Sequence, residues 1–271
     1  MRLVSAHAGR LITVEAPSDD GTSRPNGLFS ATGLPVWDAL LPPTGLARGV
    51  MHEVLYRPGH PIPAFFALLL ARMTRAGEPE TRNPKPETRF HPAAFALDSD
   101  FRFPISSFPL VWLDPDGTLY PPAVFAAGIE PKDLWLLRPR DADDLLWSTA
   151  ECLRCRGVSA TIAPLPVNRP LDRRDARRLQ LAVERGGGAG LLLRVLNRHA
   201  DVYAAATRWL VEPAPGARFI QRWKITLIHG HGGRIGNGFL LEHCRDPFEN
   251  HPVRAIAELD RGSGAATARA G

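Results

Sequence analysis

Cysteine is scarce in this chain of 271 residues, and its count is odd. Cys152, Cys155 and Cys244 cannot provide a disulfide framework, and so sparse a set is typical of a protein in a reducing compartment. No run of about 18 apolar residues is present, and residues 1–16 lack the uninterrupted apolar core of a signal peptide. We therefore expect a soluble cytoplasmic protein.

Positive charge is only slightly in excess of negative charge. Proline, in contrast, is abundant. The net charge of +5, from 33 basic and 28 acidic residues, permits an anionic partner but does not require one. The 26 prolines exceed the usual share of about 5%. Stiff, irregular connections between helices and strands are therefore expected in a chain long enough for one large domain or two small ones.

The middle of the chain alternates apolar strand patterns with helix patterns. Strands are predicted at 52–56, 110–114, 134–137, 158–163 and 190–196, and helices at 63–76, 121–127, 141–156 and 172–185. This alternation predicts an α/β fold with a mostly parallel central sheet flanked by helices on both faces. Residues 202–211 and 218–228 flank a Pro-Gly turn, which predicts an antiparallel hairpin at one edge of the sheet.

Composition shifts divide the chain into an arm, a core and a tail. Residues 1–27 are expected to form an N-terminal arm and residues 28–245 the core domain. Within the core, residues 77–108 are charged and proline-rich, and we expect them to form a flexible insertion. Residues 246–271 are polar and rich in small residues, which predicts a disordered C-terminal tail.

Residues 52–73 have the layout of a phosphate-binding loop: a short strand, a turn rich in Pro and Gly, and an apolar helix. Such a loop binds phosphate through backbone N–H groups, a Lys and a hydroxyl. Here three of the six residues 58–63 are proline, and residues 53–73 contain no Lys, Ser or Thr. Our interpretation is a nucleotide-binding architecture whose anion site has been dismantled. The alternative is an ordinary strand-to-helix turn that never bound a ligand.

Two short motifs carry metal-binding residue types. Cys152 and Cys155 form a Cys-x-x-Cys pair late in a predicted helix, but no second pair follows at zinc-ribbon spacing. His229 and His231 flank a glycine at the end of a predicted strand, and the sequence supplies no further ligands beside them. We expect buried thiols rather than a metal or redox site, and we assign no metal-binding residues.

Four arginines are clustered on the helix predicted at 172–185. Arg173, Arg174, Arg177 and Arg178 lie within one another's i, i+3 and i+4 reach. Clustered arginine on a helix can neutralise phosphates or pair with an acidic protein surface, which makes these residues candidates for DNA or partner contact. A solvated helix face without a ligand is the alternative.

The order of motifs resembles that of the RecA-type recombinases. Residues 32–38 and 45–49 resemble the start of the recombinase core, and residues 113–116 resemble its second-strand acidic motif. Within that superfamily the chain is similar to the ImuA family of RecA-like accessory proteins, over roughly residues 28–243. The segments that carry this resemblance are 112–122, 137–141, 176–187 and 205–209.

The resemblance implies a role in bacterial SOS mutagenesis. Its implied partners are an ImuB-like inactive relative of Y-family polymerases and an error-prone replicative-type polymerase, with RecA and single-stranded DNA as further candidates. Some relatives are described as SulA-like, which implies inhibition of RecA or of cell division as an alternative role. No membrane partner is implied.

The departures from the recombinase pattern bear on catalysis. Aligning the loop places Ile62 at the position of the phosphate-binding Lys and Pro63 at the position of the Mg²⁺-binding hydroxyl. Pro164 and Leu165 follow the strand whose end carries the metal-binding Asp in recombinases, and Asp116 lies near the position of their catalytic Glu. A single carboxylate cannot stabilise the charge that develops in phosphoryl transfer. We therefore expect a non-catalytic scaffold without a cofactor; a DNA-dependent ATPase with an unorthodox loop is the alternative.

Overall fold

The structure, a computed structural model, describes nine stretches of the chain. They are residues 2–7, 10–15, 29–30, 34–41, 46–74, 108–196, 205–230, 235–244 and 253–259. The predicted insertion lies outside the described residues except for Phe108, and so do most of the predicted arm and tail. Within the described ranges, no helix is long and apolar enough to cross a lipid bilayer.

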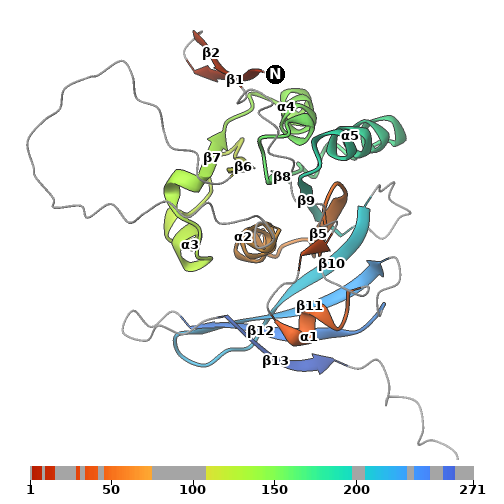
Figure 1. Ribbon diagram of the computed structural model, residues 1–271. Helices are drawn as coiled ribbons and strands as arrows, with labels where there is room; N and C mark the ends of the chain where they lie inside the picture. The colour runs from red at the N-terminus through yellow and green to blue at the C-terminus, as the bar shows by residue number, and fades with distance from the viewer. Residues whose placement is uncertain are drawn as a thin grey trace, which may run out of the picture.

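A nine-stranded sheet forms the centre of the molecule (Figure 1). Its strands run in the spatial order β13-β12-β11-β10-β5-β9-β8-β6-β7. Their bounds are β5 Met51–Tyr56, β6 Leu110–Leu113, β7 Leu134–Leu137, β8 Ala160–Pro164, β9 Ala189–Val195, β10 Ala205–Ala214, β11 Ile220–Gly230, β12 Gly238–Cys244 and β13 Arg254–Leu259. The strands from β10 to β7 pair in parallel, and those from β10 to β13 pair antiparallel.

Two small antiparallel sheets accompany the large one. They pair β1 (Arg2–His7) with β2 (Arg10–Glu15), and β3 (Phe29–Ser30) with β4 (Leu46–Ala47). The first lies within the predicted N-terminal arm.

Helices cover both faces of the parallel half, as the sequence predicts. One apolar cluster joins α2 (Ala64–Met73) and α3 (Pro121–Ala126) to one face, and a second joins α4 (Ala142–Arg154) and α5 (Arg173–Gly186) to the other. The short helix α1 (Pro35–Asp38) packs on the antiparallel strands β12 and β13. A short 3₁₀ helix (Pro131–Asp133) precedes β7. Figure 1 shows α2 and α3 on the opposite side of the sheet from α4 and α5.

The antiparallel part of the sheet is larger than the sequence predicts. β10 and β11 form the expected hairpin, but β12 and β13 extend the sheet beyond it. In β12, Phe239 and Leu241 are buried while Leu240 is half-buried, the alternation of a strand with one covered face. β13 lies within residues 246–271, where the sequence predicts a disordered tail, so the ordered sheet extends to Leu259.

The central strand β5 is buried along its whole length and contains a charged residue. Glu53 is fully buried; its Oε1 accepts a hydrogen bond from Arg194 of β9 at 2.7 Å, and its Oε2 accepts one from Arg208 of β10 at 2.8 Å. A buried carboxylate is tolerated only when it is paired and hydrogen-bonded. This triad therefore joins β5 to both of its neighbours.

A chain of hydrogen bonds on β5 and β10 fixes the protonation of a buried histidine. His52 Nε2 lies 2.9 Å from the carbonyl oxygen of Ala47, which can only accept, so Nε2 carries the proton. Nδ1 then accepts from the Thr207 hydroxyl at 2.7 Å, and that hydroxyl accepts from Trp209 Nε1 at 2.9 Å. Burial lowers the pKa of His52 to about 4, so the ring is neutral at physiological pH.

The C-terminal turns of α4 and α5 touch backbone to backbone. A Cβ placed on Gly186 would lie 1.9 Å from the carbonyl oxygen of Leu153. α5 then ends at Gly187, which adopts the left-handed conformation at φ 70° and donates its N–H to Val183 O at 2.8 Å. Glycine at 186 therefore permits the close approach, whereas glycine at 187 ends the helix.

Acidic pH should destabilise the fold through His52. The folded pKa of about 4 lies below the usual 6.5, so the stabilisation is complete above pH 6.5 and is lost as the pH falls toward 4. Between pH 7 and pH 5 we expect this group to remove about 2 kcal/mol from the free energy of unfolding. Urea unfolding at several pH values measures it. The His52→Gln variant should be less stable at pH 7 and should show a flatter pH profile; an unchanged profile would contradict this assignment.

Substituting Gly186 should separate α4 from α5. Gly186→Ala places a methyl group against the Leu153 backbone, which cannot move like a flexible side chain. We expect a loss of roughly 1–3 kcal/mol or more, as for overpacked cores. Gly157→Ala is the matched control, because its added Cβ would make only ordinary contact with Cys155 Sγ at 3.7 Å. Equal stability of the two variants in urea would show that the close approach is not rigid.

Candidate functional site

The loop after β5 closes on itself as a tight turn at the carboxyl edge of the parallel strands. The N–H of His60 donates to Arg57 O at 3.0 Å, Pro58 occupies the second position, and Gly59 has φ 81°. These are the features of a type II turn. The turn thus uses the His60 N–H internally instead of directing it toward a ligand.

Few backbone donors are left between β5 and α2. Pro58, Pro61 and Pro63 have no N–H, and the N–H of Ala64 donates to Ile62 O at 2.8 Å. Phosphate-binding loops need several successive N–H groups directed at one point. This segment has no such continuous row.

Aromatic side chains occupy the first turn of α2. Phe66 is fully buried and stacks on Trp37 with ring centroids 5.0 Å apart. Phe65 stacks on Trp223 of β11 at 5.1 Å. The beginning of the helix is therefore anchored by apolar packing on α1 and β11, with no acidic or capping side chain at its N-terminus.

The acidic residues after β6 have different surroundings. Asp114 is only 3% exposed; its Oδ1 accepts the Thr118 N–H at 2.9 Å and its Oδ2 accepts the Leu119 N–H at 3.3 Å. Asp116 is exposed. Asp114 thus closes its own loop, and Asp116 is the carboxylate available to solvent. Among the described residues, no three His, Cys, Asp or Glu side chains are grouped so that they could hold a metal ion.

The Cys-x-x-Cys pair consists of buried thiols, as expected. Cys152 and Cys155 are both free and buried at the end of α4. Burial raises the pKa of Cys152 to about 12, so the reactive, metal-binding thiolate form is disfavoured. Of the histidine pair, His229 is half-buried at the end of β11, and His231 lies outside the described residues.

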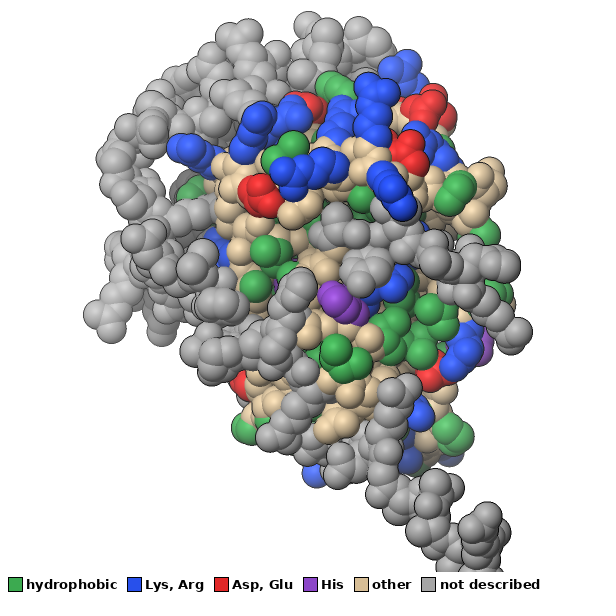
Figure 2. Space-filling view, turned by 90° about the vertical axis from the view of Figure 1, so that its right-hand side faces the viewer, with side chains coloured by type: hydrophobic (Ala, Val, Ile, Leu, Met, Phe, Trp, Pro, Cys, Tyr) green, Lys and Arg blue, Asp and Glu red, His purple; other side chains and the backbone are tan. Residues whose placement is uncertain are grey.

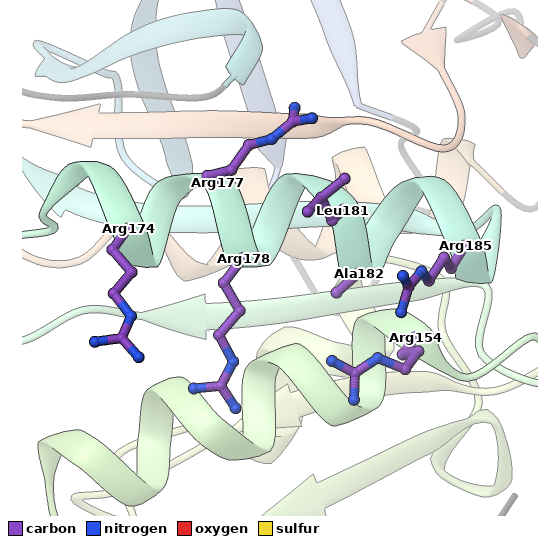
Figure 3. A pocket seen from close by; sticks show the side chains of 7 residues that line it. All are labelled: Arg154, Arg174, Arg177, Arg178, Leu181, Ala182 and Arg185. Carbon is purple, nitrogen blue, oxygen red and sulfur yellow. The ribbon is translucent and has the colours of Figure 1, made fainter.

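The four arginines predicted as contact residues divide between two sides of α5. Arg174 and Arg178 project toward α4, whereas Arg177 projects to the other side of the helix (Figure 3). Arg177 donates to Gln180 Oε1 at 3.1 Å, and Arg173 lies one turn before it. The helix therefore places two of the four beside its neighbour α4.

Arg174 and Arg178 belong to a larger basic groove. A surface hollow of about 320 Å³ lies between α4 and α5, and we call it the α4–α5 groove. Its lining residues are Arg154, Arg174, Arg177, Arg178, Leu181, Ala182 and Arg185. Figure 2 shows Lys and Arg side chains gathered in the upper part of the view, on the side of the molecule that carries α5 in Figure 1. The residues predicted from the sequence did not include Arg185, although Arg185 follows Arg178 by two helical turns. They also did not include Arg154, because only the packing of α4 on α5 brings Arg154 near the arginines of α5.

Removing the Asp114 carboxylate should loosen the 114–119 loop. Asp114→Ala leaves two backbone N–H groups without their acceptor, which should cost about 1–2 kcal/mol of unfolding free energy. Asp116→Ala, in the same loop but exposed, should change stability by less than about 0.5 kcal/mol. Urea titrations of both variants provide the measurement. If Asp116→Ala proved the more destabilising, the structural role would belong to Asp116 instead.

Comparisons with known proteins find similarity to this chain in sequence and in fold. No family model matches the chain. Protein ImuA from two strains of Caulobacter vibrioides is 28% identical over 166 residues, which covers 55% of this chain and 66%, just under two thirds, of each relative. The crystal structure of the RadB recombinase superimposes with a TM-score of 0.53 at 12% identity, covering 79% of this chain and 95% of that one. The chain thus resembles Protein ImuA in sequence and has a RecA-like α/β fold.

Proposed function

We propose that this chain is a non-catalytic, RecA-like accessory protein of SOS-induced translesion DNA synthesis, acting in the cytoplasm through protein partners. The observation that carries this proposal is the Pro-Gly turn of residues 57–63, at the place where a RecA-type recombinase would bind nucleotide phosphates. A fold kept without a phosphate site is best explained as a scaffold.

The chemistry of phosphoryl transfer supports a non-enzymatic role. That reaction depends on positioned cations, metal ions and N–H donors around the phosphates. The turn keeps few donors, Phe65 and Phe66 pack in the first turn of α2, and Leu165 after β8 is apolar and buried. The exposed Asp116 would have no phosphate-binding Lys in the loop after β5 to act with.

The proposed partners follow from the similarity to Protein ImuA. They are an ImuB-like inactive relative of Y-family polymerases and, through it, an error-prone replicative-type polymerase; RecA is a further candidate. The antiparallel strands β10–β13 offer these proteins a surface away from α4 and α5.

A second candidate is a DNA-dependent ATPase of recombinase type. The likeness to a recombinase fold and the exposed Asp116 at the carboxyl edge favour it. In that case nucleotide would have to bind without the usual N–H cradle, and the two candidates differ in this measurable property.

Nucleotide binding separates the two candidates. A fluorescent ATP analogue titrated with Mg²⁺, with and without single-stranded DNA, should show no saturable binding up to millimolar concentrations and no phosphate release. In parallel, the purified chain should capture the ImuB-like protein equally well with and without ATP. Saturable Mg²⁺-dependent binding that is abolished by Asp116→Ala would overturn the scaffold and favour the ATPase.

A further inference from the structure

The α4–α5 groove has a fixed shape because its two walls are in contact. The backbone of Gly186 lies against that of Leu153 and Arg154. At that end the helices cannot approach without a clash, and they cannot separate without losing this contact. In Figure 3 the side chains of Arg154, Arg174, Arg178 and Arg185 extend along this groove from both helices. A concave surface lined by guanidinium groups results.

Most of the positive charge in the groove is not neutralised by the protein. Within the described part of the chain, no carboxylate forms an ion pair with Arg174, Arg178 or Arg185. Arg154 pairs with Glu151, but its Nε is buried there without a hydrogen-bond partner among the described atoms.

The nearest acids on α5 do not weaken this surplus. Asp175 is bound to Arg169 at 2.8 Å, and Glu184 lies two turns after Arg177, on the other side of the helix. Arg174, Arg178 and Arg185 therefore present positive charge without an ion-pair partner among the described residues.

The residue type indicates what the groove binds. Neither α4 nor α5 contains a lysine, so every cation in the groove is a planar guanidinium. Guanidinium groups bind phosphate in a bidentate manner, and a row of them can follow a phosphate chain. Arg174 and Arg178 lie one helical turn, about 6 Å, apart, and Arg185 is about 10 Å further along the same side.

Apolar side chains beside the arginines favour a single strand of nucleic acid over a duplex. Leu181, 37% exposed, lies between the arginines, and Trp147, 47% exposed, lies two turns before Arg154 on the same side of α4. Unpaired bases stack on exposed aromatic rings, whereas a duplex keeps its bases inside the helix. An acidic protein segment could pair with the arginines but would leave Trp147 without a stacking partner.

We propose that the α4–α5 groove binds the phosphodiester backbone of single-stranded DNA, with Arg174, Arg178, Arg185 and Arg154 on the phosphates and Trp147 stacked on a base. The choice of DNA rests on the proposed function, because a protein of translesion synthesis acts where single-stranded DNA is exposed. The position of the site rests on the shape of the groove and on the arginines that have no ion-pair partner among the described residues.

Salt-dependent binding of the full-length chain to a fluorescein-labelled oligothymidylate tests the site. Each phosphate contact on a single strand contributes about 0.7 to the slope of log affinity against log salt. Arg174→Gln/Arg178→Gln should therefore reduce that slope by about 1.4 and weaken binding roughly tenfold. Arg173→Gln/Arg218→Gln removes the same charge from two exposed arginines that do not line the groove, and should reduce the slope by much less.

Trp147 provides an independent test of single-strand recognition. Trp147→Ala should weaken oligothymidylate binding about tenfold, whereas Trp147→Phe, which keeps an aromatic face, should retain most of it. Neither variant should change the salt slope, because no charge is removed. Thermal unfolding monitored by circular dichroism establishes that each variant is folded.

Several outcomes would overturn the proposal. These are no oligothymidylate binding by the unaltered chain, an equal loss of slope in the two arginine pairs, or tighter binding of duplex DNA than of the single strand. Displacement of the oligonucleotide by poly-glutamate at equal charge concentration would instead assign the groove to an acidic protein segment. Capture of the ImuB-like protein by the Arg174→Gln/Arg178→Gln variant should be unchanged. Failure of the DNA-binding proposal is therefore distinguishable from failure of the scaffold proposal.

Discussion

The buried carboxylate of Glu53 is the constraint on which the architecture depends. An ionised group without water needs partners, and its two oxygens find them on the two strands that flank β5. Either arginine alone would leave one oxygen unsatisfied. β5 must therefore lie between β9 and β10, and β10 is the strand at which the parallel half meets the antiparallel half. The loop that follows β5 is thereby placed at the carboxyl edge of the parallel strands.

Local chemistry made much of the parallel half predictable. Strand and helix alternation gave the order of elements, and Asp141 caps α4 as predicted, its Oδ1 accepting the Asp144 N–H at 2.8 Å. The glycines after 185 correctly marked the end of α5, although Gly186 still belongs to the helix. In each case the signal is contained within a few consecutive residues, which is why it can be read without knowing the packing.

Features that depend on packing were missed. The sequences of β12 (GFLLEHC) and β13 (RAIAEL) lack a strict alternation of apolar and polar residues, so their pairing partners, rather than their own pattern, make them strands. Clustering in sequence grouped four arginines, but helix geometry separates Arg177 from Arg178. Arg154 joins the groove only because α4 packs on α5. The buried role of Asp114 likewise depends on where the loop folds back, which residue identity alone does not reveal.

The glycine contact between α4 and α5 lowers the entropic cost of binding a ligand in the groove. Because the two helices meet at Gly186, the backbone around the groove is already ordered before anything binds. A ligand would restrict only the rotamers of the arginine side chains, at about 0.5–1.5 kcal/mol each, with no backbone ordering to offset. Affinity in such a groove is set by side-chain entropy and electrostatics, and a lysine in place of any arginine would alter both.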